Sequence, residues 1–274
     1  MEFLNYKKDK MSIGNLITRI KGCLAVLVAL GACVAQAETL LIYGDDSYPP
    51  VIYSASGKPT GFLVDILRKV SAITGDTYQV RLFPWKRAFE HARAGHAAVV
   101  GVSKTAERLT QFDFSDAIYF DDIQIIVKKG REFAYTQLSD LKGKTVGGVL
   151  GASYGDVVDA AIKDGLFKME QDSGQKGRLH KVLLDRVDAA FIGNGTEGFD
   201  MVVRSDPELQ ARRAELVVLN TPLTRDPLHL AVAKSVGKKA LIERFNIALR
   251  EVQKVAVAKV SSKDPMAKSK QNKP

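Results

Sequence analysis

The stretch from residue 39 to residue 84 decides the fold. It begins with "TLLIYG" (39–44), continues through "GFLVDILRKVSAITG" (61–75) and ends in "YQVRLFP" (78–84). The first and last pieces are short apolar runs typical of strands. The middle piece has apolar side chains at helical spacing, and Gly75 is placed to end the helix. The stretch therefore predicts a strand–helix–strand unit.

Strands and helices keep alternating along the rest of the chain. The expected elements are helix 85–95, strand 97–103, strand 122–129, strand 141–151, helix 153–165 with Ser153 as its N-cap, a helix and a short strand within 178–194, strand 214–220, strand 226–234 and helix 238–254. Such alternation predicts an α/β fold with mostly parallel strand pairing.

We expect two lobes, because the pattern restarts after strand 122–129. This strand and the stretch 219–228 are interpreted as two chain crossings, which would form a hinge that closes over a ligand. The predicted organisation is lobe 1 in residues 38–124, lobe 2 in 125–222, a return to lobe 1 in 223–254, and a disordered tail in 255–274. The tail is polar, rich in lysine and without periodicity.

The first 37 residues are predicted to be a secretory signal peptide. Basic residues precede an apolar run from Cys23 to Ala35, and Ala35-Gln36-Ala37 is a small-x-small cleavage site. At about 13 residues the run is short for a membrane span, so we expect export to the periplasm. The residues before Cys33 also match a lipoprotein box. A strand that begins near Thr39 leaves almost no tether, so a soluble product is favoured over one anchored at Cys33.

The formal net charge of +9 is concentrated at the two ends of the chain. Residues 1–37 carry five basic and two acidic residues, and the end from Lys254 carries six lysines and one aspartate, which leaves the body near +1. Nucleic-acid binding needs a basic face on the fold itself, so it is not expected. Both cysteines, Cys23 and Cys33, lie in the leader, so the mature chain is expected to have no disulfide.

The sequence lacks the common signatures of catalysis and of cofactor binding. Its four histidines do not have the spacing of a metal site. No nucleophile elbow of the form G-x-S-x-G, no P-loop and no dinucleotide-binding glycine pattern occurs. We therefore expect no metal, no cofactor and no enzymatic activity.

The candidate site is a set of polar residues that follow the predicted strands, where ligands bind in open α/β sheets. In "GVSKTAERLTQFDFS" (101–115), Arg108 offers a planar fork of donors that matches a carboxylate. Ser103 and Thr105 supply hydroxyl groups beside it. Gly151-Ala152-Ser153 is expected to open a helix whose free N–H groups favour an anion. These residues predict a small polar ligand with an anionic group.

Five segments together resemble one known family in their order and spacing. They are "SYPPV" (47–51), "GKPTGFLVDILRKV" (57–70), "SKTAERLTQFDFSDAIY" (103–119), "LKGKTVGGVLGASYG" (141–155) and "DRVDAAFIGN" (185–194). The chain from about 39 to 250 resembles the extracellular solute-binding proteins of family 3, the receptors of polar amino-acid ABC importers. The resemblance implies the two-lobed type II periplasmic-binding-protein fold, with a monomer that delivers its ligand to a permease in the inner membrane.

The resemblance also implies roles for particular residues. Arg108 would hold the ligand α-carboxylate with help from Ser103 and Ser153, and Tyr48 would pack against the ligand. Replacing Arg108 by Ala should then weaken binding by about 2–4 kcal/mol. Trp85, in "PWKRAF", would form another wall of the pocket.

One role of the family does not carry over. Amino-acid receptors bind the α-ammonium with an acidic residue at the position of Gly193, so the amino-acid assignment stays open. Asn194 and Glu197 are candidates for the other end of the ligand.

The expected function is therefore capture of a small polar carboxylate, an amino acid or a related compound, for an ABC importer. Two alternatives stay open. One is a periplasmic dehydratase on the same fold, with Glu197 or Asp46 as general acid. The other is a ligand-sensing partner of a membrane kinase or cyclase.

Overall fold

A computed structural model describes the backbone of residues 37–263 and the side chains up to residue 256. Residue contacts divide the chain into the units Met1–Ala37 and Glu38–Pro274, and all described helices and strands belong to the second. The predicted signal peptide, with Cys23 and Cys33, lies outside the described residues except for Ala37. None of the helices in the described part is long and apolar enough to cross a membrane.

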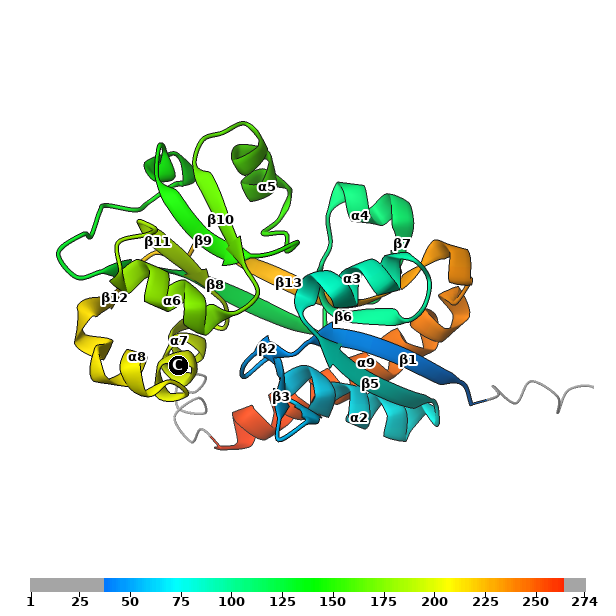
Figure 1. Ribbon diagram of the computed structural model, residues 1–274. Helices are drawn as coiled ribbons and strands as arrows, with labels where there is room; N and C mark the ends of the chain where they lie inside the picture. Colours follow the sequence, from blue (N-terminus) through cyan, green and yellow to red (C-terminus); the bar gives the residue numbers. More distant parts are fainter. Residues whose placement is uncertain (1–36, 264–274) are drawn as a thin grey trace, which may run out of the picture. The chain divides into compact units, whose positions relative to one another are not determined.

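The first lobe is built on the predicted strand–helix–strand unit (Figure 1). Strand β1 (Thr39–Asp45) pairs in parallel with β5 (Thr77–Phe83) on one side and with β6 (Ala98–Ser103) on the other. Between them run α2 (Phe62–Thr74) and α3 (Trp85–Arg93). Gly75 takes a left-handed conformation with φ 77° and ends α2, as the sequence predicts. Short helix α4 (Ala106–Gln111) follows β6.

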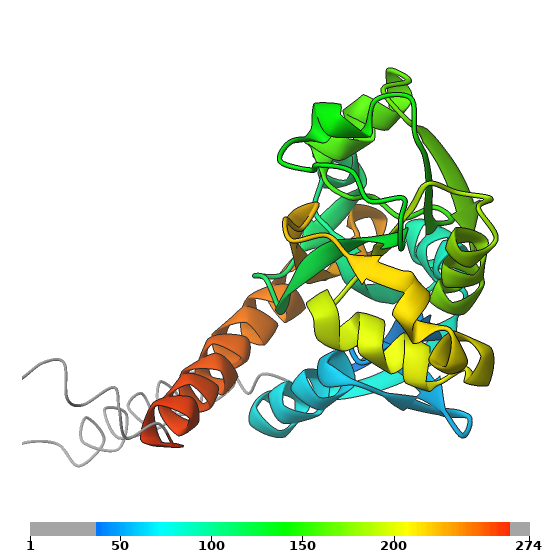
Figure 2. The same cartoon turned by 90° about the vertical axis from the view of Figure 1, so that its left-hand side faces the viewer.

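The last helix, α9 (Lys239–Lys263), packs beside α2 and closes the core of the first lobe (Figure 2). Leu241, Phe245 and Leu249 of this helix lie in one cluster with Leu63 and Leu67 of α2. The expectation that residues 255–274 form a disordered tail is wrong for 255–263, which continue α9. No Gly or Pro interrupts the chain before Pro265, and adding residues to a formed helix needs no new nucleus. The rest of the tail lies outside the described residues.

The first lobe also contains a small separate sheet that the sequence analysis did not predict. It consists of β2 (Ser47–Tyr48), β3 (Ile52–Ala55) and β4 (Lys58–Thr60), paired antiparallel. The sheet follows directly after β1 and carries Tyr48. It therefore brings an aromatic side chain to the carboxyl end of the first strand.

The second lobe repeats the α/β arrangement. Strand β9 (Thr145–Val149) pairs in parallel with β10 (Lys168–Asp172) and β11 (Ala189–Ile192). Its other elements are β12 (Leu216–Val218), α5 (Asp156–Lys163), α6 (Gln175–Leu183), α7 (Gly195–Arg204) and α8 (Pro207–Ala211). Sequence reasoning missed β10, α7 and α8.

Two long antiparallel strands, β8 (Tyr119–Lys128) and β13 (Thr224–Ala233), join the lobes. They pair with each other over 119–123 and 224–228. Beyond that, β8 pairs with β11 and β12 of the second lobe, and β13 pairs with β6 and with β7 (Phe112–Phe114) of the first. The mutual pairing of β8 and β13 thus joins the sheets of the two lobes. Two crossings of this kind allow hinge closure of the cleft between the lobes.

Candidate functional site

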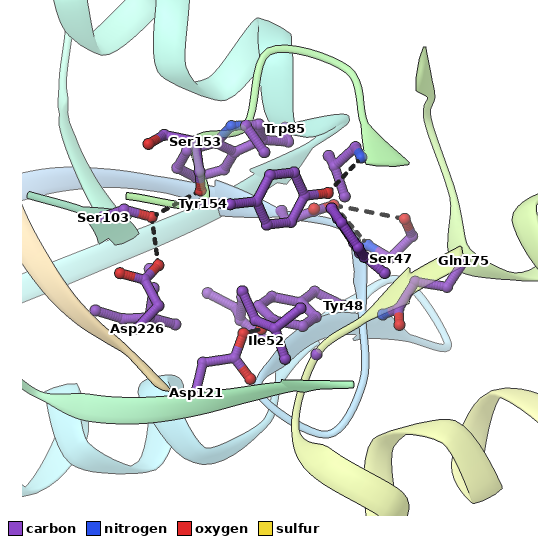
Figure 3. A pocket seen from close by; sticks show the side chains of 18 of the residues that line it. Ser47, Tyr48, Ile52, Trp85, Ser103, Asp121, Ser153, Tyr154, Gln175 and Asp226 are labelled. Atoms are coloured by element: carbon purple, nitrogen blue, oxygen red, sulfur yellow. Dashed lines mark hydrogen bonds between the residues drawn. The ribbon is translucent and has the colours of Figure 1, made fainter. Parts of the chain in front are cut away.

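A cavity that is partly open to solvent lies where the two lobes meet. The first lobe contributes Asp45, Ser47, Tyr48, Trp85 and Ser103, and the second contributes Ser153, Tyr154, Gln175, Arg178 and Gly193. The crossing strands add Asp121 and Asp226 (Figure 3). Its mixture of aromatic and polar walls suits a small molecule.

Hydrogen bonds between the lobes surround this cavity. The indole Nε1 of Trp85 donates to the carbonyl of Gly151 at 3.1 Å, and the hydroxyl of Ser47 donates to the carbonyl of Ser173 at 3.2 Å. The amide of Ala106 donates to the carboxylate of Asp156 at 3.2 Å. The lobes are therefore in contact around the cavity.

Asp121 is the centre of a buried hydrogen-bond group. Its carboxylate accepts the Tyr48 hydroxyl and the Asn194 backbone amide. Burial raises the pKa of Asp121, and these two donors act against the rise. Gly193 makes the contact possible, because a Cβ there would lie 2.2 Å from the Tyr48 hydroxyl.

Asp226 lies opposite Asp121 and holds the second carboxyl group of the crossing strands. The two residues are direct partners in the β8–β13 pair, so both side chains project from the same face of the ribbon. The Ser103 hydroxyl lies 2.5 Å from a carboxylate oxygen of Asp226 and 3.2 Å from the carbonyl of Ser153. Burial raises the pKa of Asp226 to about 6.

Asp45, at the end of β1, is a third buried carboxyl group on the lining. It accepts the backbone amide of Ser47 at 2.9 Å. Burial raises the pKa of Asp45 to about 7, and the nearby charge of Asp46 adds to the rise while that of Arg178 opposes it. Three carboxyl groups with little access to water thus face one cavity.

Within the described part of the chain, Arg178 is the only basic side chain on the cavity lining. Its side chain is 1% exposed and pairs with Asp172 at 2.7 Å. Its Nη1 donates to the carbonyl of Phe191 at 2.6 Å. Gly147 leaves room for it, because a Cβ at that position would lie 2.7 Å from Arg178 Cγ. Asp172 therefore neutralises this guanidinium.

Four of the eight predicted site residues line the cavity: Tyr48, Trp85, Ser103 and Ser153. Asn194 is buried next to it and accepts the Tyr119 hydroxyl with its side-chain oxygen. Glu197 is exposed in the first turn of α7 and does not line the cavity. The structure therefore does not place Glu197 at the other end of a ligand bound there.

Arg108 and Thr105 line a neighbouring polar hollow rather than the cavity itself. Arg108 is 7% exposed, and its guanidinium donates to the carbonyl of Ser103 at 3.0 Å and to that of Gly151 at 3.5 Å. The ring of Phe89 lies 4.5 Å from Arg108 Cζ. Thr105 is the N-cap of α4 and accepts the Arg108 amide. Arg108 thus joins the lobes beside the cavity, and Thr105 fixes the start of the helix that carries it.

Ser153 does not cap a helix, contrary to the sequence prediction. Helix α5 begins at Asp156 with Gly155 as N-cap. The Tyr154 amide donates to Asp159, and the Gly155 amide donates to the Ser153 hydroxyl. The Ala152 amide donates to the carbonyl of Val149, so the helix start expected at Gly151-Ala152-Ser153 does not form.

Sequence reasoning missed Asp121, Asp226 and Gln175 as site residues, and it did not select Asp45 although this residue follows the first predicted strand. Asp121 and Asp226 stand inside strands that are otherwise mostly apolar, and this was the available signal. Gln175 is 5% exposed and lines the cavity, and neither its Nε2 nor its Oε1 has a hydrogen-bond partner among the described residues. In the same part of the chain, no group of three or more His, Cys, Asp or Glu side chains is placed to hold a metal ion.

Comparisons with known proteins point to one family. The model of "Bacterial extracellular solute-binding proteins, family 3" matches residues 40–263. The chain is 27% identical over 230 residues to the L-cystine-binding protein TcyJ of Escherichia coli (strain K12), covering 81% of this chain and 80% of that protein. It is 26% identical to the arginine-binding extracellular protein ArtP of Bacillus subtilis (strain 168), covering 87% and 92%.

Solved structures agree with this match. An ancestral arginine-binding protein bound to arginine superimposes with a TM-score of 0.65 at 27% identity, over 79% of this chain and 92% of that one. A histidine kinase sensor domain with similarity to periplasmic binding proteins gives a TM-score of 0.68 at 21% identity, over 81% and 93%. The second likeness concerns the fold alone.

Proposed function

Because the chain belongs to the bacterial extracellular solute-binding proteins of family 3, we propose that it captures a small polar solute between its lobes. The solute is then handed to an ABC permease in the inner membrane. The observation that carries the proposal is the cavity between two hinged lobes, with the Gln175 amide unpartnered inside it. A buried amide without a partner is costly, and a polar ligand would satisfy it.

The proposed solute is an amino acid or a related compound. Relatives named for binding L-cystine and arginine support this class. Within the site, Tyr48, Trp85, Ser103 and Ser153 would contact the ligand. Arg108 would act from beside the cavity, by holding the closed lobes together, and Thr105 would position Arg108 by capping α4.

The protein is proposed to work in the periplasm as a monomer. The leader sequence supports export, because its basic start, apolar run and small-x-small site are those of a signal peptide. Pull-down of an ABC permease with the ligand-loaded protein would test the partner. Capture of a membrane kinase or cyclase would instead indicate a sensory role.

A thermal-shift screen tests the proposed function. The panel contains amino acids, amines and small carboxylates, each added to the mature protein. A ligand at about 100 times its Kd stabilises the native state by about 2.7 kcal/mol and should raise Tm by about 5–10 °C. A panel in which no solute changes Tm would contradict the proposal.

One observation favours a second candidate, a dehydratase-type enzyme. A general acid must hold its proton near neutral pH, and burial raises the pKa of Asp45 to about 7 and that of Asp226 to about 6. Glu197 and Asp46, the acids expected from sequence, do not line the cavity. Turnover of a cyclic carboxylate that is lost in Asp226→Asn would support the enzyme, and binding without turnover would support the receptor.

A further inference from the structure

The cavity wall carries acidic groups at two separate places. Asp121 and Asp226 lie on the crossing strands (Figure 3). Asp45 lies at the end of β1. We propose that the ligand is a small organic cation with two positively charged nitrogens, and that its binding requires no carboxylate. This inference rests on the proposed receptor function and names the chemical class of its ligand.

The first cation site is the cross-strand pair of Asp121 and Asp226. Residues directly opposite in an antiparallel pair have Cβ atoms about 4.5–5.5 Å apart, and two like charges there repel. Each carboxyl group has hydrogen-bond donors, Tyr48 and Asn194 for Asp121 and Ser103 for Asp226, but no Lys or Arg side chain of the described residues forms an ion pair with either. An ammonium group between them would remove the repulsion.

The second cation site combines Asp45 with the Gln175 amide. The Asp45 carboxylate accepts the backbone amide of Ser47. The Ser47 hydroxyl donates across the lobe boundary to the carbonyl of Ser173, two residues before Gln175. Gln175 is 95% buried, lines the cavity and has neither amide atom paired within the described residues. Its Oε1 is a free acceptor for a second ammonium or guanidinium group. This observation does not depend on the charges of the acidic residues.

The space between the two sites has walls suited to a hydrocarbon chain. Tyr48 and Ile52 form one side of the cavity, and Trp85 and Tyr154 form the other (Figure 3). Aromatic and aliphatic side chains pack against methylene groups, and aromatic faces also attract cations. A linear chain with a charged nitrogen at each end fits this arrangement of polar ends and apolar middle.

On the cavity lining, a ligand carboxylate finds no unpaired cationic side chain among the described residues. Arg178 is already paired with Asp172, and Arg108 lies outside the lining and donates to two carbonyl groups. The Tyr154 amide donates to Asp159 of α5, and the Gly155 amide donates to the Ser153 hydroxyl. A carboxylate would instead face three carboxyl groups, so an amino acid should bind less well than the amine formed by its decarboxylation.

Isothermal titration calorimetry at pH 7.5 with three matched pairs tests the inference. The pairs are lysine and cadaverine, arginine and agmatine, and ornithine and putrescine. We expect a decarboxylated member to bind, and to bind roughly tenfold or more tightly than its amino acid. Binding only of amino acids, or only of solutes with a single positive charge, would overturn the inference and leave the receptor function standing. If no solute of any class binds, both fail.

A variant pair links binding to the cross-strand carboxylates. Asp226→Asn keeps the shape of the side chain. It should lower the affinity for the amine that binds by roughly tenfold or more. Asp122→Asn is the matched control, because Asp122 is the next residue after Asp121 and contacts Arg225 on the surface at 3.6 Å. Equal loss in both variants would indicate a general charge effect and overturn the assignment. Where Asp226→Asn lowers Tm strongly, Asp45→Asn provides the same test at the second site.

The pH dependence of binding gives a further readout. Asp226 faces Asp121 of β8, Arg108 of α4 and Asp159 of α5, and Asp45 faces Asp46 and Arg178. Burial keeps the pKa of Asp226 near 6 and that of Asp45 near 7, so a dication must displace protons from them. Affinity should therefore rise from pH 5.5 to 7.5 with proton release, and Asp226→Asn should flatten this rise. Affinity independent of pH would overturn the role of these carboxylates.

Discussion

At the scale of single residues, the crossing strands carry a conflict between stability and binding. Asp121 and Asp226 are like-charged groups placed directly opposite each other and shielded from water. Such a pair destabilises the ligand-free fold when both groups are ionised. Natural proteins commonly tolerate such conflicts at functional sites, so the position of this pair in the cleft is a functional signal.

The stability of the ligand-free protein should therefore fall as pH rises from about 4 to 7. An unfolded aspartate loses its proton near pH 3.8, whereas Asp226 and Asp45 keep theirs in the fold up to a pKa of about 6 and about 7. In that window the native state binds more protons than the unfolded state does. Each group therefore lowers the free energy of unfolding by up to about 1.4 kcal/mol per unit of rising pH. Carboxylates of lowered pKa, such as Glu38, act mainly below the window.

Urea denaturation at pH 4.5, 5.5 and 6.5 measures this effect. The Asp226→Asn variant cannot titrate at this position, so its free energy of unfolding should decline less steeply than that of the wild type. Asp122→Asn should follow the wild type. Parallel pH profiles for wild type and Asp226→Asn would contradict the raised pKa of Asp226.

At the scale of elements, one ion-pair group ties the start of β1 to the last helix. Arg244 of α9 donates to Glu38 at 3.0 Å and to Asp76 at 3.2 Å, and Lys238 also pairs with Glu38. Asp76 is 1% exposed and accepts the Glu38 amide at 2.9 Å. The contacts join the first strand, the start of β5 and the last helix of the first lobe.

Replacing Arg244 by Ala should lower the free energy of unfolding by about 2 kcal/mol, because it leaves the buried Asp76 without its charged partner. Chemical denaturation of the variant measures the loss. Arg68→Ala is the control, since Arg68 pairs with Asp65 on the exposed face of α2 and should cost less than about 0.5 kcal/mol. Equal losses in the two variants would show that the Arg244 group contributes no more than a surface pair.

At the scale of the whole fold, closure brings Trp85 to the lobe boundary. Trp85 is the only tryptophan in the chain, is 7% exposed and donates to Gly151 of the opposite lobe. Opening about β8 and β13 would break this bond and expose the indole. Ligand binding should therefore shift the tryptophan emission to shorter wavelength, by a population shift to the closed form.

Titration of the fluorescence with a solute that binds by calorimetry checks this prediction. Trp85→Phe abolishes the fluorescence signal and also removes the hydrogen bond between the lobes. Calorimetry on this variant should therefore show ligand binding weakened by about 1 kcal/mol. Unchanged emission at saturation would mean that Trp85 has the same surroundings before and after binding, and that closure does not occur there.

The amino-acid sequence alone determined the alternation of strands and helices, the end of α2 at Gly75, the two crossings between the lobes and the family. These features follow from local periodicity and from residues that set backbone conformation, and both are readable in a short window. The same local logic placed Tyr48, Trp85, Ser103 and Ser153 near the ends of strands, where they line the cavity.

The tertiary structure alone decided the charge of the cavity. Asp121 and Asp226 face each other because β8 and β13 pair in one particular register, which no local pattern encodes. Arg108 does not line the cavity. Its guanidinium donates instead to the carbonyl groups of Ser103 and Gly151, and Gly151 belongs to the opposite lobe. Gln175 reached the cavity because α6 begins at the lobe boundary. Elements form from neighbours in the chain, whereas a site forms from side chains that only packing brings together.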